Sequence, residues 1–257
     1  MDVAGLMSRG CASGARIGIG LSGEALSSVR EKLESAGCKL SVVGFVDAGE
    51  LILSLRDGRV EAGVRGALSS SAVLKELKRI FNLKEIMRVA VLEDVDGRPF
   101  LLAPVGIDEG TDMQSRLGLA REAIRYFGRA GWSIRTGVLS KGRPEDASRG
   151  DEIMRSLDEG EKIAAAMGSE GGGAAHYSIL VEQAVKECDL ILAPDGVSGN
   201  LMFRTLHFVG GGKAYGAPVV NLERVFVDTS RGKKDFADSI VLAAGLASLL
   251  SGEPVKA

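Results

Sequence analysis

Apolar runs of strand length alternate with helical patterns at the start of the chain. Strands are expected at 16–21, 39–46 and 60–64, and the segments 23–36 and 48–56 between them carry apolar residues at helical spacing. This alternation predicts a βαβαβ unit with a parallel sheet. The fold class that it indicates is α/β.

The pattern changes beyond residue 82, after a further helix expected at 72–81. Apolar runs at 88–93 and 100–105 flank Asp96 and Gly97, which is typical of an antiparallel hairpin, and a second domain is expected to begin here. The remaining expected elements are, in order, a helix at 111–129, a strand at 132–139, a polar linker at 141–151, a helix at 151–167, a glycine loop at 169–173, a helix at 177–187, a strand at 189–193, a helix at 199–209, a strand at 217–222 and a helix at 236–250.

Composition excludes several classes of protein. The 257 residues carry 32 basic and 34 acidic side chains, and a net charge of −2 provides no broad field for a nucleic-acid backbone or an anionic membrane. The longest apolar run, 240–250, is shorter than the roughly 20 residues that a membrane helix needs. The first fifteen residues lack the apolar stretch of a secretory signal, and we expect them to form a loose lead-in to the first strand.

Cysteine and histidine usage narrows the chemistry further. Cys11, Cys38 and Cys188 stand far apart without CxxC spacing, so neither a disulfide scaffold nor a structural zinc site is expected. Two histidines leave little scope for a metal centre or a histidine-dependent triad. His176, beside the glycine loop, is better suited to function than His207, which is expected to be packed. We expect a cytoplasmic protein without a metal.

Basic and hydroxyl residues follow the strand expected at 60–64. In VRGALSSS, Arg65 precedes Ser69, Ser70 and Ser71 at the start of a helix. A guanidinium, hydroxyls and free backbone N–H groups at such a place can hold a phosphate or a carboxylate. The alternative is that one serine is simply an N-cap.

A second group follows the strand expected at 189–193. The motif APDGVSGN places Asp195, Ser198, Gly199 and Asn200 where open α/β sheets bind ligands, just past a strand. An ordinary strand-to-helix loop with Ser198 as the cap explains the same residues.

A third group lies ahead of the last helix. VDTSRGKKDFAD contains Ser230, Arg231 and Gly232, and a hydroxyl, a guanidinium fork and backbone amides together suit a tetrahedral oxyanion. Asp235 and Asp238 lie one helical turn apart, so that one of them could accept a proton. The alternative is that both only favour the positive end of the helix.

One glycine motif carries little weight. GIGLSG, 18–23, matches the GxGxxG pattern of dinucleotide-binding proteins, but two of its glycines fall inside an expected strand. A lone match of this kind is weak support for nicotinamide binding.

The segment 189–246 resembles the carboxy-terminal signature of the phosphate acetyl- and butyryltransferases. The matching positions are, in order, Pro194, Asp195, Ser198, Gly199, Asn200, Arg204, 210–212, Ser230, Arg231 and Gly232. EAGVRGALSSSAVL at 61–74, and the hairpin of MRVAVLED and FLLAPVGI, are similar to earlier parts of that family. The nearest subgroup is methanogenesis marker protein 4, the methyltransferase Mtx subunit X group.

The resemblance implies a two-domain phosphotransacetylase-like (isocitrate dehydrogenase-like) fold with an interdomain cleft. It implies a discontinuous domain of 1–82 and 200–257, an inserted domain of 83–199 carrying the interface of a homodimer, and acyl transfer between phosphate and coenzyme A with no tightly bound cofactor. Arg231 would offset phosphoryl charge and Ser230 would donate a hydrogen bond to the tetrahedral intermediate. The substrate-binding residues would be Arg65, Ser69, Ser70, Ser71, Asp195, Ser198, Gly199, Asn200 and Gly232.

The chain departs from the family at the proton acceptor. The acetyltransferases place an aspartate seven residues after the serine, and this chain has Ala237 there, between Asp235 and Asp238. Either aspartate would have to accept the thiol proton of coenzyme A. The alternative function is a subunit of a methanogen methyltransferase complex in which the cleft is vestigial or regulatory, with other methyltransferase subunits as partners.

Overall fold

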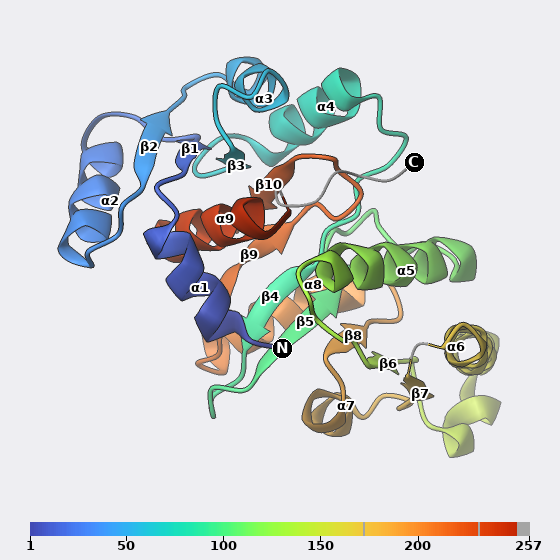
Figure 1. The fold of residues 1–257 in the computed structure, drawn as a ribbon. Helices are drawn as coiled ribbons and strands as arrows, with labels where there is room; N and C mark the ends of the chain where they lie inside the picture. Colours follow the sequence, from blue (N-terminus) through green and yellow to red (C-terminus); the bar gives the residue numbers. More distant parts are fainter. Residues whose placement is uncertain (172, 231, 251–257) are drawn as a thin grey trace. The chain divides into compact units, whose positions relative to one another are not determined.

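The chain forms two units in the computed structural model, which describes residues 1–171, 173–230 and 232–250 (Figure 1). Unit 1 consists of Met1 and Met87–Ala214, and unit 2 consists of Asp2–Ile86 and Tyr215–Ala257. Residues 200–214 were predicted to belong to the discontinuous domain. The structure assigns this segment to unit 1, because the helix that contains its first residues packs against a strand of that unit.

Unit 2 is built on five strands in the order β2-β1-β3-β10-β9. Strands β2, β1, β3 and β10 run parallel, so their carboxyl ends lie at one edge, and β9 is antiparallel to β10. The strands are β1 (Arg16–Ile19), β2 (Ser41–Gly44), β3 (Ala62–Val64), β9 (Lys213–Pro218) and β10 (Val225–Asp228).

Helices cover both faces of the unit 2 sheet. One face carries α3 and α4, which pack on each other, and the other carries α9 with α1 and α2 (Figure 1). Helix α9 is apolar on all sides and almost entirely buried, which is the pattern of a core helix. The bounds are α1 (Val3–Ala12), α2 (Gly23–Ser35), α3 (Ala48–Arg56), α4 (Ser70–Phe81) and α9 (Ala237–Leu250).

Unit 1 has its own five strands in the order β4-β5-β8-β6-β7. The hairpin β4–β5 is antiparallel, as the sequence predicted, and β5, β8, β6 and β7 are parallel. The strands are β4 (Ala90–Glu93), β5 (Pro99–Ala103), β6 (Thr136–Val138), β7 (Ala174–His176) and β8 (Leu190–Leu192). The helices are α5 (Met113–Arg129), α6 (Asp151–Ser169), α7 (Val181–Glu187) and α8 (Gly196–Arg204), with a 3-10 helix at Pro144–Arg149 and a π-helical turn at Thr205–Val209.

The first residues form a helix, so the prediction of a loose lead-in was wrong. Helix α1 buries Val3, Leu6 and Gly10 against α9. A Cβ on Gly10 would lie 2.2 Å from the backbone oxygen of Val241, and one on Gly245 would lie 2.4 Å from that of Leu6. The small residues Gly10 and Gly245 allow the two helices to approach this closely.

Cys11 and Cys38 form a disulfide, although neither a disulfide scaffold nor a structural zinc site was expected from the spacing of the cysteines. Cys11 lies in the last turn of α1 and Cys38 just beyond α2, where Lys39 N donates to the backbone oxygen of Cys11 at 2.8 Å. The two cysteines are 27 positions apart, and only the packing of α1 brings their Cα atoms to 4.4 Å. The third cysteine, Cys188, is buried and free.

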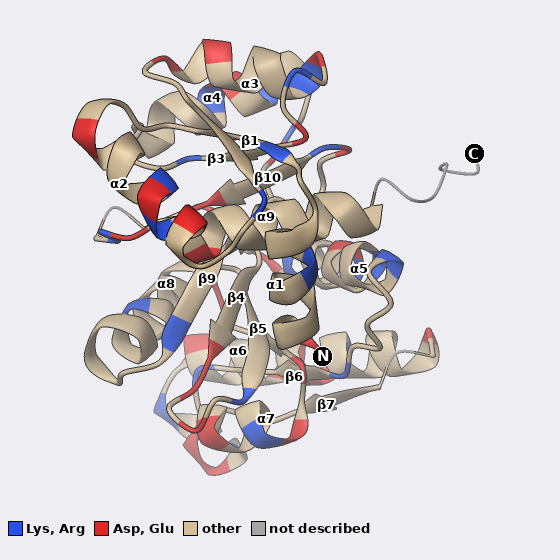
Figure 2. Cartoon of the chain, turned by 60° about the vertical axis from the view of Figure 1, so that its left-hand side comes forward, with Lys and Arg blue, Asp and Glu red and all other residues tan. Residues whose placement is uncertain are grey.

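Charge is distributed without one dominant sign over the helices of unit 2. Acidic and basic side chains alternate along α2, and α3 carries one of each sign, whereas α9 carries only Asp238 (Figure 2). Within the part of the chain that the structure describes, no helix combines the length and apolar character needed to cross a membrane.

Candidate functional site

Two loops meet at the carboxyl edge of the unit 2 sheet. Strands β3 and β10 are parallel neighbours with Val64 opposite Val227, so the loop that leads to α4 and the loop that leads to α9 start side by side. Arg65 N donates to the backbone oxygen of Val227 at 3.0 Å and continues the pairing by one residue. This edge is where open parallel sheets bind ligands.

The side chain of Arg65 is engaged inside the protein. It is only 3% exposed, and its Nε donates to Oδ1 of Asp228, which is 7% exposed. Its Nη1 donates to the backbone oxygen of Leu68 at 2.9 Å. The guanidinium predicted to bind an anion therefore already has an anionic partner.

Further hydrogen bonds hold the two loops together. Asp228 Oδ1 also accepts from Thr229 N at 2.8 Å, and Thr229 Oγ1 donates to the backbone oxygen of Gly66 at 3.2 Å. Gly66 has a φ of +60°, and a Cβ there would lie 2.5 Å from the backbone oxygen of Gly20. The loop conformation at this point thus requires glycine.

The serine cluster lies at the start of α4. Ser69 occupies the N-cap position, but its side chain makes no capping bond and instead lies 2.9 Å from Ser71 Oγ. Ser69 and Ser71 are exposed and Ser70 is half-buried. Within the described residues no side chain caps this helix, so its first N–H groups remain free to bind an acceptor.

The loop before α9 contains the residues of the third sequence motif. Ser230 is half-buried, and its Oγ accepts from Gly232 N at 3.3 Å. Arg231 lies outside the described residues. Lys233 donates from Nζ to Ser239 Oγ at 2.9 Å and to the backbone oxygen of Tyr215 at 3.3 Å, which ties the loop to α9 and β9.

The two candidate proton acceptors differ in their surroundings. Asp235 forms an ion pair with Lys32 and accepts from Ala237 N at 3.0 Å. Partial burial raises the pKa of Asp235, but the bonds from Lys32 and Ala237 N outweigh it, so the pKa lies below its ordinary value. Asp238 is half-buried in the first turn of α9. A carboxylate with a lowered pKa is a poor base, and this disfavours Asp235.

In unit 1, Asp195 has a structural partner on each oxygen. It is the N-cap of α8, where Oδ1 accepts from Ser198 N at 2.7 Å, and Oδ2 lies 2.8 Å from Lys141 Nζ. Burial raises the pKa of Asp195, but Lys141 and Ser198 N lower it further, so the net shift is downward. Lys141 also binds Glu152 at 2.6 Å, and the two carboxylates raise its pKa.

The other residues of that motif pack α8 against the loop after β5. A Cβ on Gly199 would lie 1.9 Å from the backbone oxygen of Pro104, and one on Gly196 would lie 1.8 Å from that of Gly106. Asn200 Nδ2 donates to the backbone oxygen of Val105 at 2.8 Å. Both glycines and Asn200 therefore serve the contact between helix and loop.

Comparison with known proteins shows the family to which the chain belongs. The chain is 41% identical over 225 residues to a protein of Methanosarcina barkeri named "Putative methyltransferase mtx subunit X", and the match covers 87% of this chain and 83% of that protein. The chain belongs to the Mtx subunit X family. The resemblance noted in the sequence is thereby confirmed at the level of the subgroup. No family model matches the chain.

Solved structures show the fold of this Mtx subunit X family member. A branched-chain phosphotransacylase from Enterococcus faecalis superposes with a TM-score of 0.72 at 18% identity, covering 91% of this chain and 99% of that one. A phosphotransacetylase from Streptococcus pyogenes gives 0.69 at 13% identity, covering 98% and 100%. The predicted phosphotransacetylase-like fold is confirmed, and these low identities carry no more than the fold.

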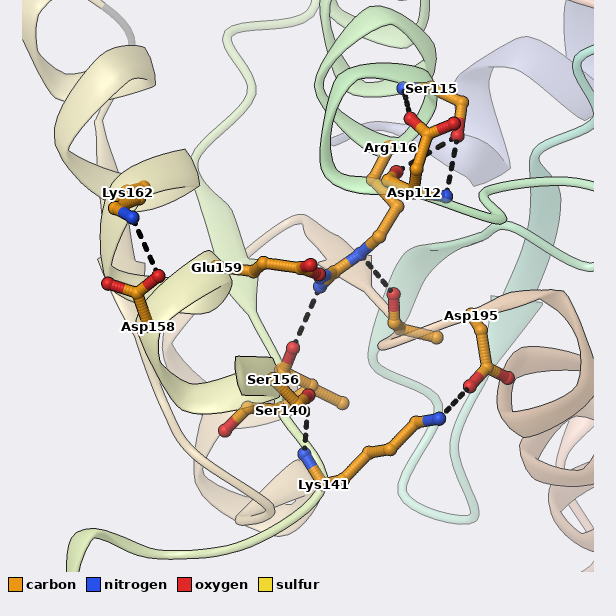
Figure 3. A network of polar contacts seen from close by, with 12 residues as sticks. Asp112, Ser115, Arg116, Ser140, Lys141, Ser156, Asp158, Glu159, Lys162 and Asp195 are labelled. Atoms are coloured by element: carbon orange, nitrogen blue, oxygen red, sulfur yellow. Dashed lines mark hydrogen bonds and ion pairs between the residues drawn. The ribbon is translucent and has the colours of Figure 1, made fainter. Parts of the chain in front are cut away.

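Arg116 was not predicted as a site residue, and it lies in the same network of polar contacts as Lys141 and Asp195 (Figure 3). It is 1% exposed; Nη2 donates to the backbone oxygen of Leu139 at 2.9 Å and Nε to that of Ala193 at 3.2 Å. Arg116 thus joins the carboxyl ends of β6 and β8. Burial lowers the pKa of this arginine. The sequence shows only an arginine inside a helix, so no signal marked it.

His176, which the sequence singled out, lies at the end of β7, and its partners were not predicted. Its Nδ1 lies 2.9 Å from Glu161 Oε1 and its Nε2 lies 3.0 Å from Ser140 Oγ. Gly160 makes room for the ring, since a Cβ there would lie 2.6 Å from Nε2. Ser140 is 1% exposed, so its hydroxyl is not an accessible nucleophile. Among the described residues, no group of histidine, cysteine and carboxylate side chains is arranged to hold a metal ion.

Proposed function

We propose that this protein binds the phosphoryl group of an acyl phosphate at the carboxyl edge of the unit 2 sheet and exchanges the acyl group between phosphate and coenzyme A. The observation that carries the proposal is the start of α4, where no side chain of the described residues caps the first N–H groups and where Ser69 and Ser71 are exposed. A helix N-terminus of this kind favours a phosphate through hydrogen bonds and the helix dipole together. The fold shared with phosphotransacylases supports the same reading.

The roles proposed for individual side chains follow from their chemistry. Ser70 and Ser71 hold the phosphoryl oxygens with the N–H groups of α4, and Ser230 donates a hydrogen bond to the oxyanion of the tetrahedral intermediate. Arg231 offsets the phosphoryl charge, a role that rests on the sequence resemblance. Gly232 allows the backbone of this loop to approach the ligand.

The transfer itself needs one proton acceptor. The thiol sulfur of coenzyme A attacks the acyl carbon, its proton passes to a carboxylate, and the bond between acyl carbon and phosphate oxygen breaks, releasing phosphate. We assign the carboxylate to Asp238, because the ion pair with Lys32 occupies Asp235 and lowers its pKa.

Purified protein provides the test. Calorimetry with inorganic phosphate measures binding, and formation of acyl-coenzyme A from acetyl, butyryl or branched acyl phosphates measures turnover. Ser71→Ala removes a hydroxyl that would bind a charged group, worth about 1.5 to 3 kcal/mol, or at least a tenfold weaker phosphate affinity. Ser28→Ala, which removes an exposed serine of α2, is the matched control. Equal affinities of both variants would exclude the α4 site.

A second candidate function is a subunit role in a methyltransferase complex. It is favoured by the name of the Methanosarcina barkeri relative, which describes a methyltransferase subunit and whose sequence is 41% identical to this chain. Tagged protein isolated from a methanogen extract would then carry methyltransferase polypeptides in fixed ratio. Protein that turns over acyl phosphates alone, as a homodimer in size-exclusion chromatography with light scattering, would instead support the acyltransferase.

A further inference from the structure

The buried Arg65–Asp228 pair joins the two loops that the proposed function uses. Its members are 163 positions apart and come from the ends of β3 and β10. Both side chains are nearly inaccessible, at 3% and 7% exposure. A phosphate in solvent cannot reach either group without displacing the loops.

The guanidinium of Arg65 makes bonds in two directions. Nε binds the Asp228 carboxylate in the loop toward α9, and Nη1 binds the backbone oxygen of Leu68, two residues before the first residue of α4. The planar fork of an arginine fixes the angle between two such bonds, which the single ammonium of a lysine does not. Arg65 thereby connects the start of α4 to the end of β10 by hydrogen bonds.

Asp228 completes the link on the other side. The same Oδ1 that accepts from Arg65 accepts from Thr229 N, and the Thr229 hydroxyl returns to the backbone oxygen of Gly66. Thr229 is 5% exposed and directly precedes Ser230. A closed set of bonds therefore runs from one loop to the other and back.

We infer that Arg65 and Asp228 are positioning residues that set Ser230 relative to the serine-bearing start of α4, and that Arg65 is not itself a ligand for the anion. The inference rests on the proposed function for the role of Ser230 and α4 in binding. The hydrogen bonds that join the two loops do not depend on that function. Removing either partner should release both loops together.

Hydrogen exchange of the full-length protein, followed by mass spectrometry, tests the link. Arg65→Lys keeps the charge and loses the fork, and Asp228→Asn keeps the shape and loses the charge. We expect both to speed amide exchange in peptides spanning 66–71 and 228–230 by about tenfold or more, since exchange reports local opening. Asp228→Asn serves alone if Arg65→Lys does not fold. Unchanged protection of either segment in the folded variants would overturn the inference.

The buried pair Arg88–Glu109 of unit 1 provides the matched control. Its Nε to Oε1 distance is 2.6 Å and its members are 8% and 9% exposed, so Glu109→Gln damages a similar pair elsewhere. It should leave the peptides 66–71 and 228–230 protected, and faster exchange there would overturn the inference by showing a general loosening.

Phosphate titration separates this inference from the proposed function. If Arg65 only positions the loops, Arg65→Lys should weaken phosphate binding only when amide exchange shows that the loops of this variant open. Weaker binding with fully protected loops would identify Arg65 as a ligand and overturn the inference. Failure of the unaltered protein to bind phosphate would remove the proposed function, and the exchange result would still decide whether the pair sets the loops.

Discussion

Charged side chains at the strand ends of this protein are largely engaged with one another. Arg65 binds Asp228, Lys141 binds Asp195, and Lys32 binds Asp235. Each pair offsets a charge that would otherwise attract a ligand or a proton. The groups that we propose for recognition of an anion in unit 2 are the hydroxyls and backbone N–H groups near α4 and Ser230, together with Arg231.

Two substitutions separate the contributions of Asp195 to stability as the cap of α8 and as the ion-pair partner of Lys141. Asp195→Ala should lower the free energy of unfolding at pH 7 by about 1 to 2 kcal/mol, because it loses the cap of α8 and the ion pair with Lys141. Asp195→Asn retains a good N-cap, so it should cost less than about 1 kcal/mol. Urea denaturation measures both, and equal losses would contradict a capping role.

The same carboxylate predicts a pH dependence. The folded-state pKa of Asp195 lies below its ordinary value of 3.8, so its stabilisation is present above that value and is lost as the pH falls through the folded-state pKa. The stability difference between the protein and Asp195→Asn should therefore hold from pH 7 to 5 and shrink below about pH 4. A difference that persists in full at pH 2.5 would contradict the assignment.

The two aspartates near α9 predict different kinetic losses. Asp238→Asn should reduce kcat for acyl-coenzyme A formation by roughly 100-fold or more, which is the usual contribution of a general base. Asp235→Asn should reduce it far less, because Lys32 holds that carboxylate. Steady-state rates from pH 5 to 9 measure both, and a larger loss for Asp235→Asn would reverse the assignment.

At the residue scale, the sequence located the strand ends but not the partners. VRGALSSS and VDTSRG could be recognised as polar groups after apolar runs. That Arg65 would be neutralised by Asp228 could not, because the pairing of β3 with β10 brings them together over 163 positions. Arg116 and the His176 group depend in the same way on contacts between distant elements.

At the scale of elements, some helices and strands could be predicted from the sequence and others could not. Helix α3 was predicted at its observed bounds, because Asp47 caps it and its apolar residues are periodic. Strands β7 and β10 were missed, although strands as short as β3 and β8 were predicted. Helix α8 begins three residues earlier than predicted, at Gly196, because Asp195 and not Ser198 is the cap.

The contact of α8 with the loop after β5 predicts a sharp contrast between two glycines. Gly199→Ala forces a Cβ against the backbone of Pro104 and should cost about 1 to 3 kcal/mol. Gly118→Ala, in the middle of α5, meets only Met87 Cε at 3.9 Å and should stabilise by about 0.5 to 1 kcal/mol through helix propensity. Thermal and urea unfolding measure both, and a neutral Gly199→Ala would contradict the close packing.

At the scale of the whole molecule, unit 2 is assembled from two distant stretches of chain. The chain leaves it at Ile86 and returns at Tyr215. The contacts that join the stretches include the pairing of β10 with β3 and the packing of α9 against α1. The helix missed in the sequence is thus one of the elements that closes this unit.

Reduction of the disulfide between Cys11 and Cys38 should destabilise unit 2. The disulfide encloses a loop of 27 positions, for which the loss of chain entropy in the unfolded state corresponds to roughly 3.5 kcal/mol. Cys11→Ser should lose about this much stability in urea and should not respond to dithiothreitol. Cys188→Ser, which removes the buried free thiol, should keep the full response to the reductant. Because α1 carries Cys11 and packs on α9, exchange in both helices should rise when the bond is opened, and unchanged protection of α1 would show that packing alone holds it.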